Sequence, residues 1–335
     1  MHPNPKRRHL LRRLCAAATA TALPIAALTP GATQAEDFPA KPITIVVPFA
    51  AGGAADVGVR RIAEKITESI GQPVLVDNRP GGAGQIGASV VKSARADGYT
   101  LYLASVGSHA INSSLYTRLS YDPVKDFAAV APLFSFTHVL IVPVNSPART
   151  PAELAALSRT KPEGLAYASM GVGTGGHLLS EMFRTRNKIE VTHVPYKGSS
   201  QAVADTVAGR FDFFFNGIVD SLPLIRDNRV RALATADTQR SPLLPNVPTL
   251  IELGYPDFVL NAWFGIVAPA GTPKPVIAKL NAEFGKAVRN PEVVAKMGEL
   301  GAKMMSGTPD EFAAMMQNET VRLAKVVHQS GAHID

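Results

Sequence analysis

Cysteine and tryptophan are scarce in this sequence, with one residue of each among 335. The single cysteine, Cys15, stands near the amino end, so the chain from residue 36 onward offers no disulfide, thiol nucleophile or zinc–thiolate site. Charged residues are also few, at 18%, while hydrophobic residues make up 46%. This balance excludes a wholly disordered chain and is typical of a large globular protein.

Acidic residues are missing from residues 1–35. Five basic residues in this segment precede an apolar run from Leu14 to Leu28, and small residues before Glu36 suit cleavage at that point. We therefore predict a secretory signal peptide over residues 1–35, read by the general or the twin-arginine export route, and a periplasmic protein.

The predicted signal also accounts for most of the net charge of +7, because without its bases 29 basic residues stand against 27 acidic ones, a net charge of +2. No basic run is interleaved with aromatic residues in the remaining chain, so we expect no nucleic-acid partner.

The chain after residue 35 also lacks an uninterrupted apolar run long enough to span a membrane. The best candidate for a membrane span, Phe127 to Val144, is interrupted by prolines and polar residues, so contact with a membrane would need a partner.

Apolar, β-rich runs alternate with segments of helical periodicity from residue 36 onward. Pro42 to Phe49 has the composition of a buried strand, and the apolar residues after Gly53 recur at helical spacing until Gly71 ends the pattern. The alternation predicts an α/β fold, a sheet covered by helices. Further strands are predicted at Pro73–Asp77, Tyr99–Ala104, Leu165–Ser169, Val191–Val194, Phe211–Phe215 and Val230–Thr235.

Two long stretches with little charge, Phe134–Asn145 and Phe258–Pro269, interrupt this rhythm. We interpret them as paired crossings between two lobes. The predicted lobe 1 is then discontinuous, with residues 36–137 plus 262–335, and lobe 2 covers residues 138–261.

Two glycine-rich turns, Gly82–Gly87 and Gly171–Gly176, satisfy the G-x-G-x-x-G pattern of dinucleotide sites. Such a site also needs a strand directly before the first glycine and an acid near the end of the next strand. Four residues separate Gly82 from its predicted strand, and Glu190 stands at the start of its strand. We therefore expect no nucleotide cofactor.

Glycine-rich turns can also expose backbone N–H groups at helix N-termini, where an anion is favoured. Phe49–Gly53 and Gly171–Gly176 could present such groups from the two lobes to a shared cleft and clamp a carboxylate. Each turn alone could equally serve only to let the chain bend tightly. Asp56 is either a first-turn acid that complements the helix dipole or an acceptor for a ligand's amine or hydroxyl, or for a bridging water.

Motifs of the common hydrolases and nucleotidases are missing: the sequence has no G-x-S-x-G elbow, H-E-x-x-H pair or P-loop. Isolated histidines are more often structural than functional, but His177 follows a glycine-rich turn and could lie at the cleft. A catalytic serine paired with His177 would be the sole support for an exported hydrolase. The phenylalanines at 211–215 are interpreted as strand core.

Six ordered motifs span the chain from residue 47 to residue 273. They are Val47–Asp56, Asp77–Gly87, Asp97–Leu101, His193–Gly198, Leu244–Thr249 and Ala268–Pro273. Together they resemble the Bug family, the periplasmic solute-binding receptors of tripartite tricarboxylate transporters.

The resemblance implies a two-lobed type II periplasmic-binding-protein fold, an α/β fold with its ligand cleft between lobes that two crossing strands join. It implies a monomeric, non-enzymatic receptor with no cofactor and no metal. The ligand would be a small organic carboxylate, such as a di- or tricarboxylate, an aromatic acid or an acidic amino acid, delivered to integral-membrane transporter subunits. The alternatives are a ligand-presenting accessory of a signalling receptor and the exported hydrolase.

The resemblance also assigns two ligand-binding walls. One wall would contain Phe49, Ala51, Gly52, Gly53, Asp56 and Ser105. The opposing wall would contain Ser169, Gly173, Thr174, His177 and Asn216. Two departures from the family pattern leave the ligand open, since Ala50-Ala51 replaces prolines and Gly175-Gly176 replaces bulkier polar residues.

Overall fold

Ten strands form one curled sheet in this computed structural model, which describes residues 38–330 and 333–334. The predicted export signal lies outside the described residues. The sheet order is β2-β1-β3-β9-β4-β7-β5-β6, and β10 and β8 also pair with β4. The strands are β1 Ile43–Val47, β2 Val74–Asn78, β3 Thr100–Ser105, β4 Phe127–Pro143, β5 Leu165–Ser169, β6 Val191–Pro195, β7 Phe213–Gly217, β8 Val230–Thr235, β9 Asn261–Pro269 and β10 Lys303–Met304.

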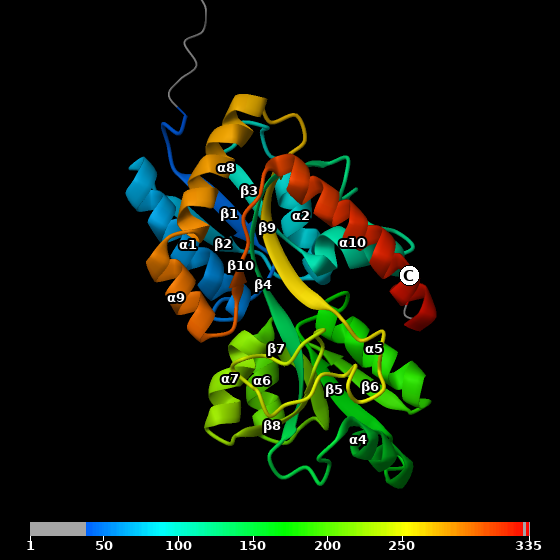
Figure 1. The fold of residues 1–335 in the computed structure, drawn as a ribbon. Helices are drawn as coiled ribbons and strands as arrows, with labels where there is room; N and C mark the ends of the chain where they lie inside the picture. The colour runs from blue at the N-terminus through cyan, green and yellow to red at the C-terminus, as the bar shows by residue number, and fades with distance from the viewer. Residues whose placement is uncertain (1–37, 331–332, 335) are drawn as a thin grey trace, which may run out of the picture. The chain divides into compact units, whose positions relative to one another are not determined.

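Helices connect these strands and cover both faces of the sheet (Figure 1). The α-helices are α1 Ala54–Ile70, α2 Gln85–Lys92, α3 Asn112–Leu115, α4 Pro151–Leu157, α5 Gly175–Asn187, α6 Ser199–Val207, α7 Ile218–Arg226, α8 Lys274–Val288, α9 Pro291–Glu299 and α10 Pro309–Ser330. Shorter turns are η2 Gly82–Gly84, η3 Gly107–Ile111 and η4 Ser158–Thr160. None of the described helices is both long and apolar enough to cross a membrane.

The long strand β4 joins two lobes, as Figure 1 shows. Its residues from Phe127 to Thr137 pair antiparallel with β9 in the lobe that also holds β1, β2 and β3. Its residues from His138 to Pro143 pair with β7 and β8 in the other lobe. The predicted fold class, two lobes of an α/β type II binding protein joined by crossing strands, is confirmed. The exact boundaries of the lobes stay a prediction.

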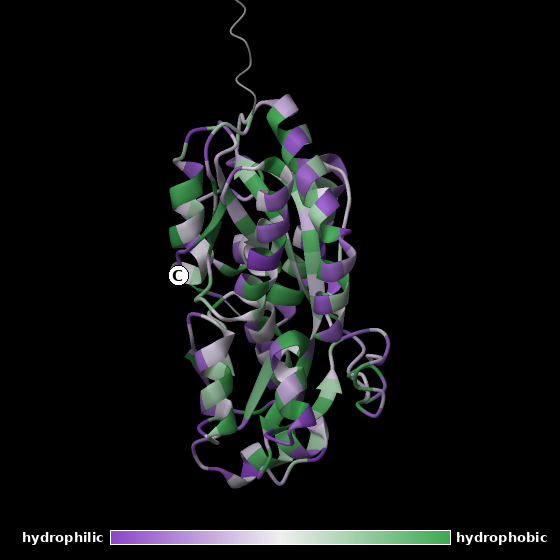
Figure 2. Cartoon of the chain, turned by 90° about the vertical axis from the view of Figure 1, so that its left-hand side faces the viewer, coloured by the Kyte–Doolittle hydropathy of each residue, from purple (hydrophilic) through white to green (hydrophobic). Residues whose placement is uncertain are grey.

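Parallel strands build the centre of each lobe, since β1 pairs parallel with β2 and β3, and β5 pairs parallel with β6 and β7. Parallel sheets need helices on both faces, so their central strands are apolar throughout. In β7, Phe213, Phe214 and Phe215 are all fully buried, which confirms that these three belong to the strand core, while Phe211 is buried just before the strand begins. Figure 2 shows largely hydrophobic strands, and helices in which hydrophobic and hydrophilic residues alternate.

Helix ends follow local capping rules. Helix α1 ends at Gly71, whose φ of 68° lies in the left-handed region that favours glycine. Helix α10 begins with a capping box, because the Glu311 N–H donates to Thr308 Oγ1 at 3.2 Å and Glu311 Oε2 accepts from the Thr308 N–H at 2.8 Å.

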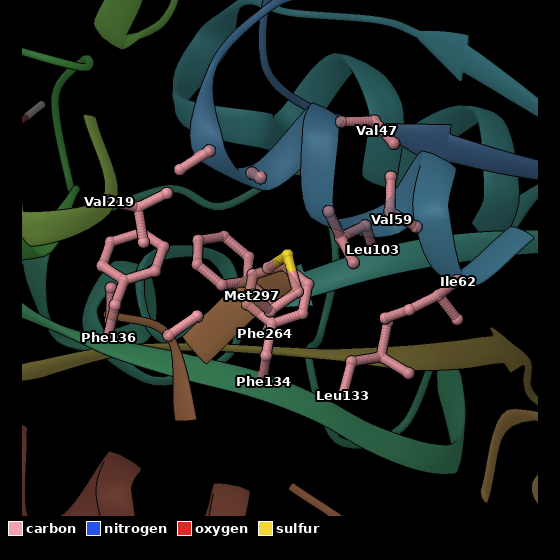
Figure 3. Close-up of a cluster of buried hydrophobic side chains, with 14 of the residues drawn as sticks. Val47, Val59, Ile62, Leu103, Leu133, Phe134, Phe136, Val219, Phe264 and Met297 are labelled. Atoms are coloured by element: carbon pink, nitrogen blue, oxygen red, sulfur yellow. The ribbon is translucent and has the colours of Figure 1, made fainter. Parts of the chain in front are cut away.

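An apolar cluster fills the region where the chain crosses between the lobes (Figure 3). Phe264 of β9 stacks on Phe134 of β4 with ring centroids 5.1 Å apart and also contacts Phe136. In Figure 3, Phe136 in turn lies beside Val219 of α7, which belongs to the other lobe. The crossing region is therefore a packed core that both lobes share.

Candidate functional site

A cavity of about 280 Å³ lies between the two lobes. The end of β3, the loops that follow β1, β2 and β3, and the end of α3 line one side, with Pro48, Phe49, Gly81, Gly82, Ala83, Gly84, Ser105, Gly107, Ser108 and Tyr116. Loops that follow β5 and β6 line the other side, with Met170, Gly171, Val172, Gly173, Thr174, Pro195, Tyr196 and Lys197. All these loops follow the carboxyl ends of strands, where open α/β sheets place their ligands.

The lobes touch on both sides of this cavity, so the structure is a closed form. On one side the Ala50 N–H donates to Lys197 O at 2.9 Å. On the other side Gly107 lies against Gly173 so closely that a β-carbon added to Gly107 would stand 2.7 Å from Gly173 O. Small residues at these points let the two backbones approach each other.

The loop after β1 brings Phe49 to the cavity, while a buried carboxylate holds the loop from behind. Asp56, 3% exposed, accepts hydrogen bonds from the Gly52 N–H at 3.0 Å, from Arg60 Nε at 3.0 Å and from Asn78 Nδ2 at 2.9 Å. Burial alone would raise the pKa of Asp56, but the bonds from Arg60, Gly52 and Asn78 outweigh it and the pKa is lowered. In the structure this acid fixes the loop and does not line the cavity.

Replacing Asp56 with Ala should loosen this loop without unfolding the protein. The change leaves the Gly52 N–H and Asn78 without their acceptor, and we expect a loss of about 1–3 kcal/mol in the free energy of unfolding together with weaker ligand binding. Because the pKa is lowered, the stabilisation is complete above the ordinary value of 3.8 and is lost as pH falls through the lower value in the folded protein. Urea unfolding at several pH values measures it.

Asp310 supplies the control, since it is an exposed acid in the first turn of α10. Asp310→Ala should change the stability by less than about 0.5 kcal/mol. Equal losses for the two variants would contradict the role of Asp56 in holding the loop.

Four consecutive residues with positive φ form the turn before α2. They are Gly81, Gly82, Ala83 and Gly84, with φ of 122°, 54°, 54° and 90°. Asn112 Nδ2 donates to Ala83 O at 2.9 Å, and the Tyr102 hydroxyl donates to Gly84 O at 3.1 Å, so tertiary contacts hold the turn. Sequence reasoning assigned this turn no ligand contact, although the second family motif contains it.

Two serines, Ser105 at the end of β3 and Ser108 after it, carry hydroxyl groups to the cavity. Ser105 Oγ and Ser108 Oγ lie 3.3 Å apart, and Ser108 Oγ lies 3.0 Å from His109 Nδ1. Burial lowers the pKa of His109 to about 3, so this ring is neutral near pH 7. The pair therefore supplies neutral hydroxyls to the cavity.

On the opposing wall, Gly173 and Thr174 reach the cavity and His177 lies behind them. Thr174 caps α5, because its Oγ1 accepts from the His177 N–H at 3.4 Å and donates to Gly171 O at 2.7 Å. The Gly173 N–H points to His177 Nδ1 at 3.4 Å. The wall is thus held by the start of α5.

A stack of two histidines supports this wall from inside. The rings of His177 and His193 lie 4.5 Å apart, and Ser169, fully buried, lies with its Oγ 2.7 Å from His193 Nε2. Burial lowers the pKa of His177, against the opposing effect of Glu181. Burial, and then His177 itself, lower the pKa of His193 to about 4. Neither ring therefore carries a full charge near pH 7.

The eleven residues predicted for the site thus fall into two groups. The cavity brings together Phe49, Ser105, Gly173 and Thr174. Ala51, Gly52, Gly53, Asp56, Ser169, His177 and Asn216 lie outside its lining, in the loop after β1, behind the second wall or in β7. Asn216 is fully buried and donates to Ser221 Oγ at 3.1 Å. Direct ligand contact by any of the eleven stays a prediction.

Within the described part of the chain, the cavity lining contains one charged side chain, the exposed Lys197, and no carboxylate. Serine, threonine and tyrosine hydroxyls and glycine-rich backbone supply its polar groups, while Phe49, Met170 and Val172 supply apolar surface. Among the described residues, no cluster of three or more His, Cys, Asp or Glu side chains is placed to hold a metal ion. The arrangement suits a small anion with an apolar body.

Known proteins share both the sequence and this fold. Residues 59–332 match the model of the tripartite tricarboxylate transporter family receptor. A protein from Pseudomonas sp. strain P51, "UPF0065 protein in tcbD-tcbE intergenic region", is 41% identical over 305 residues, which cover 90% of each chain.

Two solved structures show how close the fold is. The structure of R. palustris Rpa4515 with adipate has a TM-score of 0.85 and 34% identity, and covers 89% of this chain and 100% of its own. MatC (Rpa3494) from Rhodopseudomonas palustris with bound malate has a TM-score of 0.83 and 33% identity, and the match covers 87% of this chain and 100% of the MatC chain. With the family model matched along most of its length, the chain belongs to the receptor family of tripartite tricarboxylate transporters.

Proposed function

We propose that this protein is a periplasmic receptor, without enzymatic activity, that captures a small organic carboxylate and delivers it to the membrane subunits of a tripartite tricarboxylate transporter. The observation that carries the proposal is the closed cavity between the lobes, whose lining offers hydroxyl and backbone donors and no carboxylate. The related structures that contain adipate and malate support the ligand class.

Backbone dipoles and hydroxyls can hold a carboxylate without a buried counter-ion. The turn at Gly171–Thr174 precedes α5, whose N-terminus carries a partial positive charge, whereas the Ala50 and Gly52 N–H groups before α1 already donate to Lys197 O and Asp56. Lys197 adds a full positive charge at the edge of the cavity. Hydrogen bonds to a charged acceptor are about twice as strong as neutral ones, so a few such donors suffice.

The lining also favours some of the ligand classes that the sequence left open over others. A bound amino acid would bring an ammonium group into a cavity with no carboxylate to pair with it, and an unpaired buried charge is costly. The two oxygens of Asp56 are already engaged by Gly52, Arg60 and Asn78. We therefore propose carboxylates without an ammonium group, aliphatic or aromatic, as the ligands.

Matched pairs of compounds test this choice by isothermal titration calorimetry. Glutarate and glutamate differ by one ammonium group, as do adipate and 2-aminoadipate, and benzoate represents the aromatic acids. We expect the acid without the ammonium group to bind at least about a hundredfold more tightly in each pair that binds, because an uncompensated charge costs several kcal/mol. Tighter binding of the amino acids would contradict the ligand class, and no binding by any compound would contradict the receptor itself.

Delivery to a transporter rests on the family, and a ligand-presenting accessory of a signalling receptor is the alternative. Uptake of the labelled ligand by cells with and without this gene separates the two, since unchanged uptake would contradict delivery.

An exported hydrolase has less support. His177 Nδ1 faces the Gly173 N–H and its ring stacks on His193, so no serine hydroxyl is bonded to it in the described part of the chain.

A further inference from the structure

A residue that follows α10 pairs with the chain at the end of α3, where Tyr116 lines the cavity. Tyr116 has an extended backbone, with φ of −100° and ψ of 133°, and forms an isolated parallel bridge with Ile334. The Ile334 N–H donates to Leu115 O at 2.8 Å, and Ile334 O accepts from the Thr117 N–H at 3.0 Å and from Thr117 Oγ1 at 3.1 Å. Ile334 thus brackets Tyr116 with three hydrogen bonds, although it stands 217 positions after Thr117.

Helix α3 by itself holds Tyr116 weakly. It has four residues, and so short a helix is marginal in isolation. The last carbonyl groups of a helix lack partners within it, and the Ile334 N–H supplies one for Leu115 O. Tyr116 and Ile334 are both partly buried and pack against one apolar cluster, which includes Leu323 and Val327 of α10. Backbone pairing and apolar packing therefore act together on Tyr116.

Helix α10, which precedes Ile334, is itself bonded to elements of both cavity walls. Thr320 Oγ1 donates to His109 O at 3.1 Å, in the turn η3 that brings Gly107 and Ser108 to the cavity. At the other end of α10, Thr185 Oγ1 of α5 donates to Ser330 O at 2.9 Å. Figure 1 shows the end of α10 near α5, the helix that starts at the opposing wall. These bonds fix the end of the helix from which Ile334 reaches Tyr116.

We propose that Ile334 is a positioning residue that holds Tyr116 in the ligand cavity, and that Tyr116 contacts the bound carboxylate. The proposal rests on the proposed receptor function, because Tyr116 lines the same cavity as Ser105 and Ser108. Burial raises the pKa of Tyr116, so its hydroxyl keeps its proton near pH 7 and can donate to a carboxylate. Ile334 does not line the cavity, so it acts through Tyr116.

Ile334→Pro tests the proposal, because proline lacks the N–H that Leu115 O accepts. The change lies beyond α10, so the protein should stay folded, which circular dichroism checks. Tyr116 would then have to be ordered whenever a ligand binds. The probe is whichever of glutarate, adipate and benzoate binds the wild type most tightly, and we expect calorimetric titration to show about tenfold weaker binding.

Two further variants serve as controls in the same titration. Ile334→Val keeps both backbone groups and most of the side chain, so its affinity should stay within about twofold of the wild type. Gln329→Ala changes an exposed residue in the last turn of α10 and should leave the affinity unchanged.

A double-mutant cycle separates positioning from a general loss of stability. Tyr116→Ala removes the side chain that Ile334 is proposed to hold, and should itself weaken binding by about tenfold. Adding Ile334→Pro to Tyr116→Ala should weaken binding by less than about twofold more, because no side chain remains to be positioned. An undiminished effect of Ile334→Pro in the Tyr116→Ala protein would overturn the proposal, as would wild-type affinity in Ile334→Pro alone.

Hydrogen exchange distinguishes these outcomes from a failure of the receptor function. In the protein without ligand, the Thr117 amide should exchange at least about tenfold faster in Ile334→Pro than in the wild type, since its acceptor is no longer held in register. Equal exchange in the two proteins would overturn the docking of Ile334 beside Tyr116. If exchange differs but no carboxylate binds the wild type, the docking stands, and the ligand contact of Tyr116 is overturned together with the receptor function.

Discussion

Gly173→Ala should bind its carboxylate about a hundredfold more weakly than the wild type while the protein stays folded. A β-carbon on Gly173 would stand 2.2 Å from Asn112 Oδ1, a side chain of the opposite lobe that is fully buried. Opening the lobes relieves this clash, so its cost of about 3 kcal/mol falls on the closed form. The substitution therefore lowers the affinity by making closure of the lobes less favourable, and not by destabilising each lobe.

The φ of Gly173, +76°, adds a backbone strain that must be separated from the clash. Gly209 offers a matched control because it has the same φ and no atom within 4 Å of an added β-carbon. Gly209→Ala should lower the free energy of unfolding by about 1–2 kcal/mol and leave the affinity unchanged. Calorimetric titration of both variants gives the ligand affinity, and urea unfolding gives the free energy of unfolding. An unchanged affinity in Gly173→Ala would exclude the clash.

The contact partner gives a second check. Asn112→Ala removes the oxygen that the new β-carbon would meet, so the double variant Gly173→Ala/Asn112→Ala should regain part of the affinity. Part of the loss will remain, since Asn112 also holds the cavity turn through Ala83 O.

Gly176→Ala, three residues further along, should instead destabilise the fold. Its β-carbon would stand 2.2 Å from the backbone oxygen of Phe215, which belongs to the same lobe, so opening the cleft brings no relief. Overpacking against a strand costs up to about 3 kcal/mol, and alanine returns only about 1 kcal/mol of helix propensity. We expect the melting temperature to fall by up to about 3 °C.

Gly298 in α9 is the control for this prediction, because nothing lies within 4 Å of a β-carbon added there. Gly298→Ala should be neutral or stabilise the protein by up to about 1 kcal/mol. Thermal unfolding followed by circular dichroism compares the two. A Gly176→Ala protein as stable as the wild type would show that α5 can shift away from β7.

Local patterns predicted most of the fold. The strands at Leu165–Ser169 and Val230–Thr235 have the predicted bounds, and α1 ends at Gly71 as its spacing indicated. These signals are local, since apolar periodicity and a left-handed glycine depend on few neighbours. The predicted family resemblance is likewise confirmed by the match over residues 59–332.

The cavity lining was predicted only in part, because contacts between distant residues shape it. Ala83 has a φ of 54°, which no local signal indicates for alanine, and Asn112 holds it from another element. Tyr196 and Lys197 reach the cavity from a motif that was noted without a site role. The partners of Asp56 were left open as well, although Arg60 stands at the i+4 position where a helix brings two side chains together.

The sheet order has a consequence for the order in which the protein can fold. Strand β9 lies between β3 and β4, yet more than a hundred residues that build the other lobe separate β4 from β9 in the sequence. A growing or translocating chain can therefore complete the pairing of β5, β6, β7 and β8 before β9 is available to pair with β3. The lobe that contains β1, β2 and β3 is thus the last to be completed, and until then the unpaired edge of β3 needs protection from other chains.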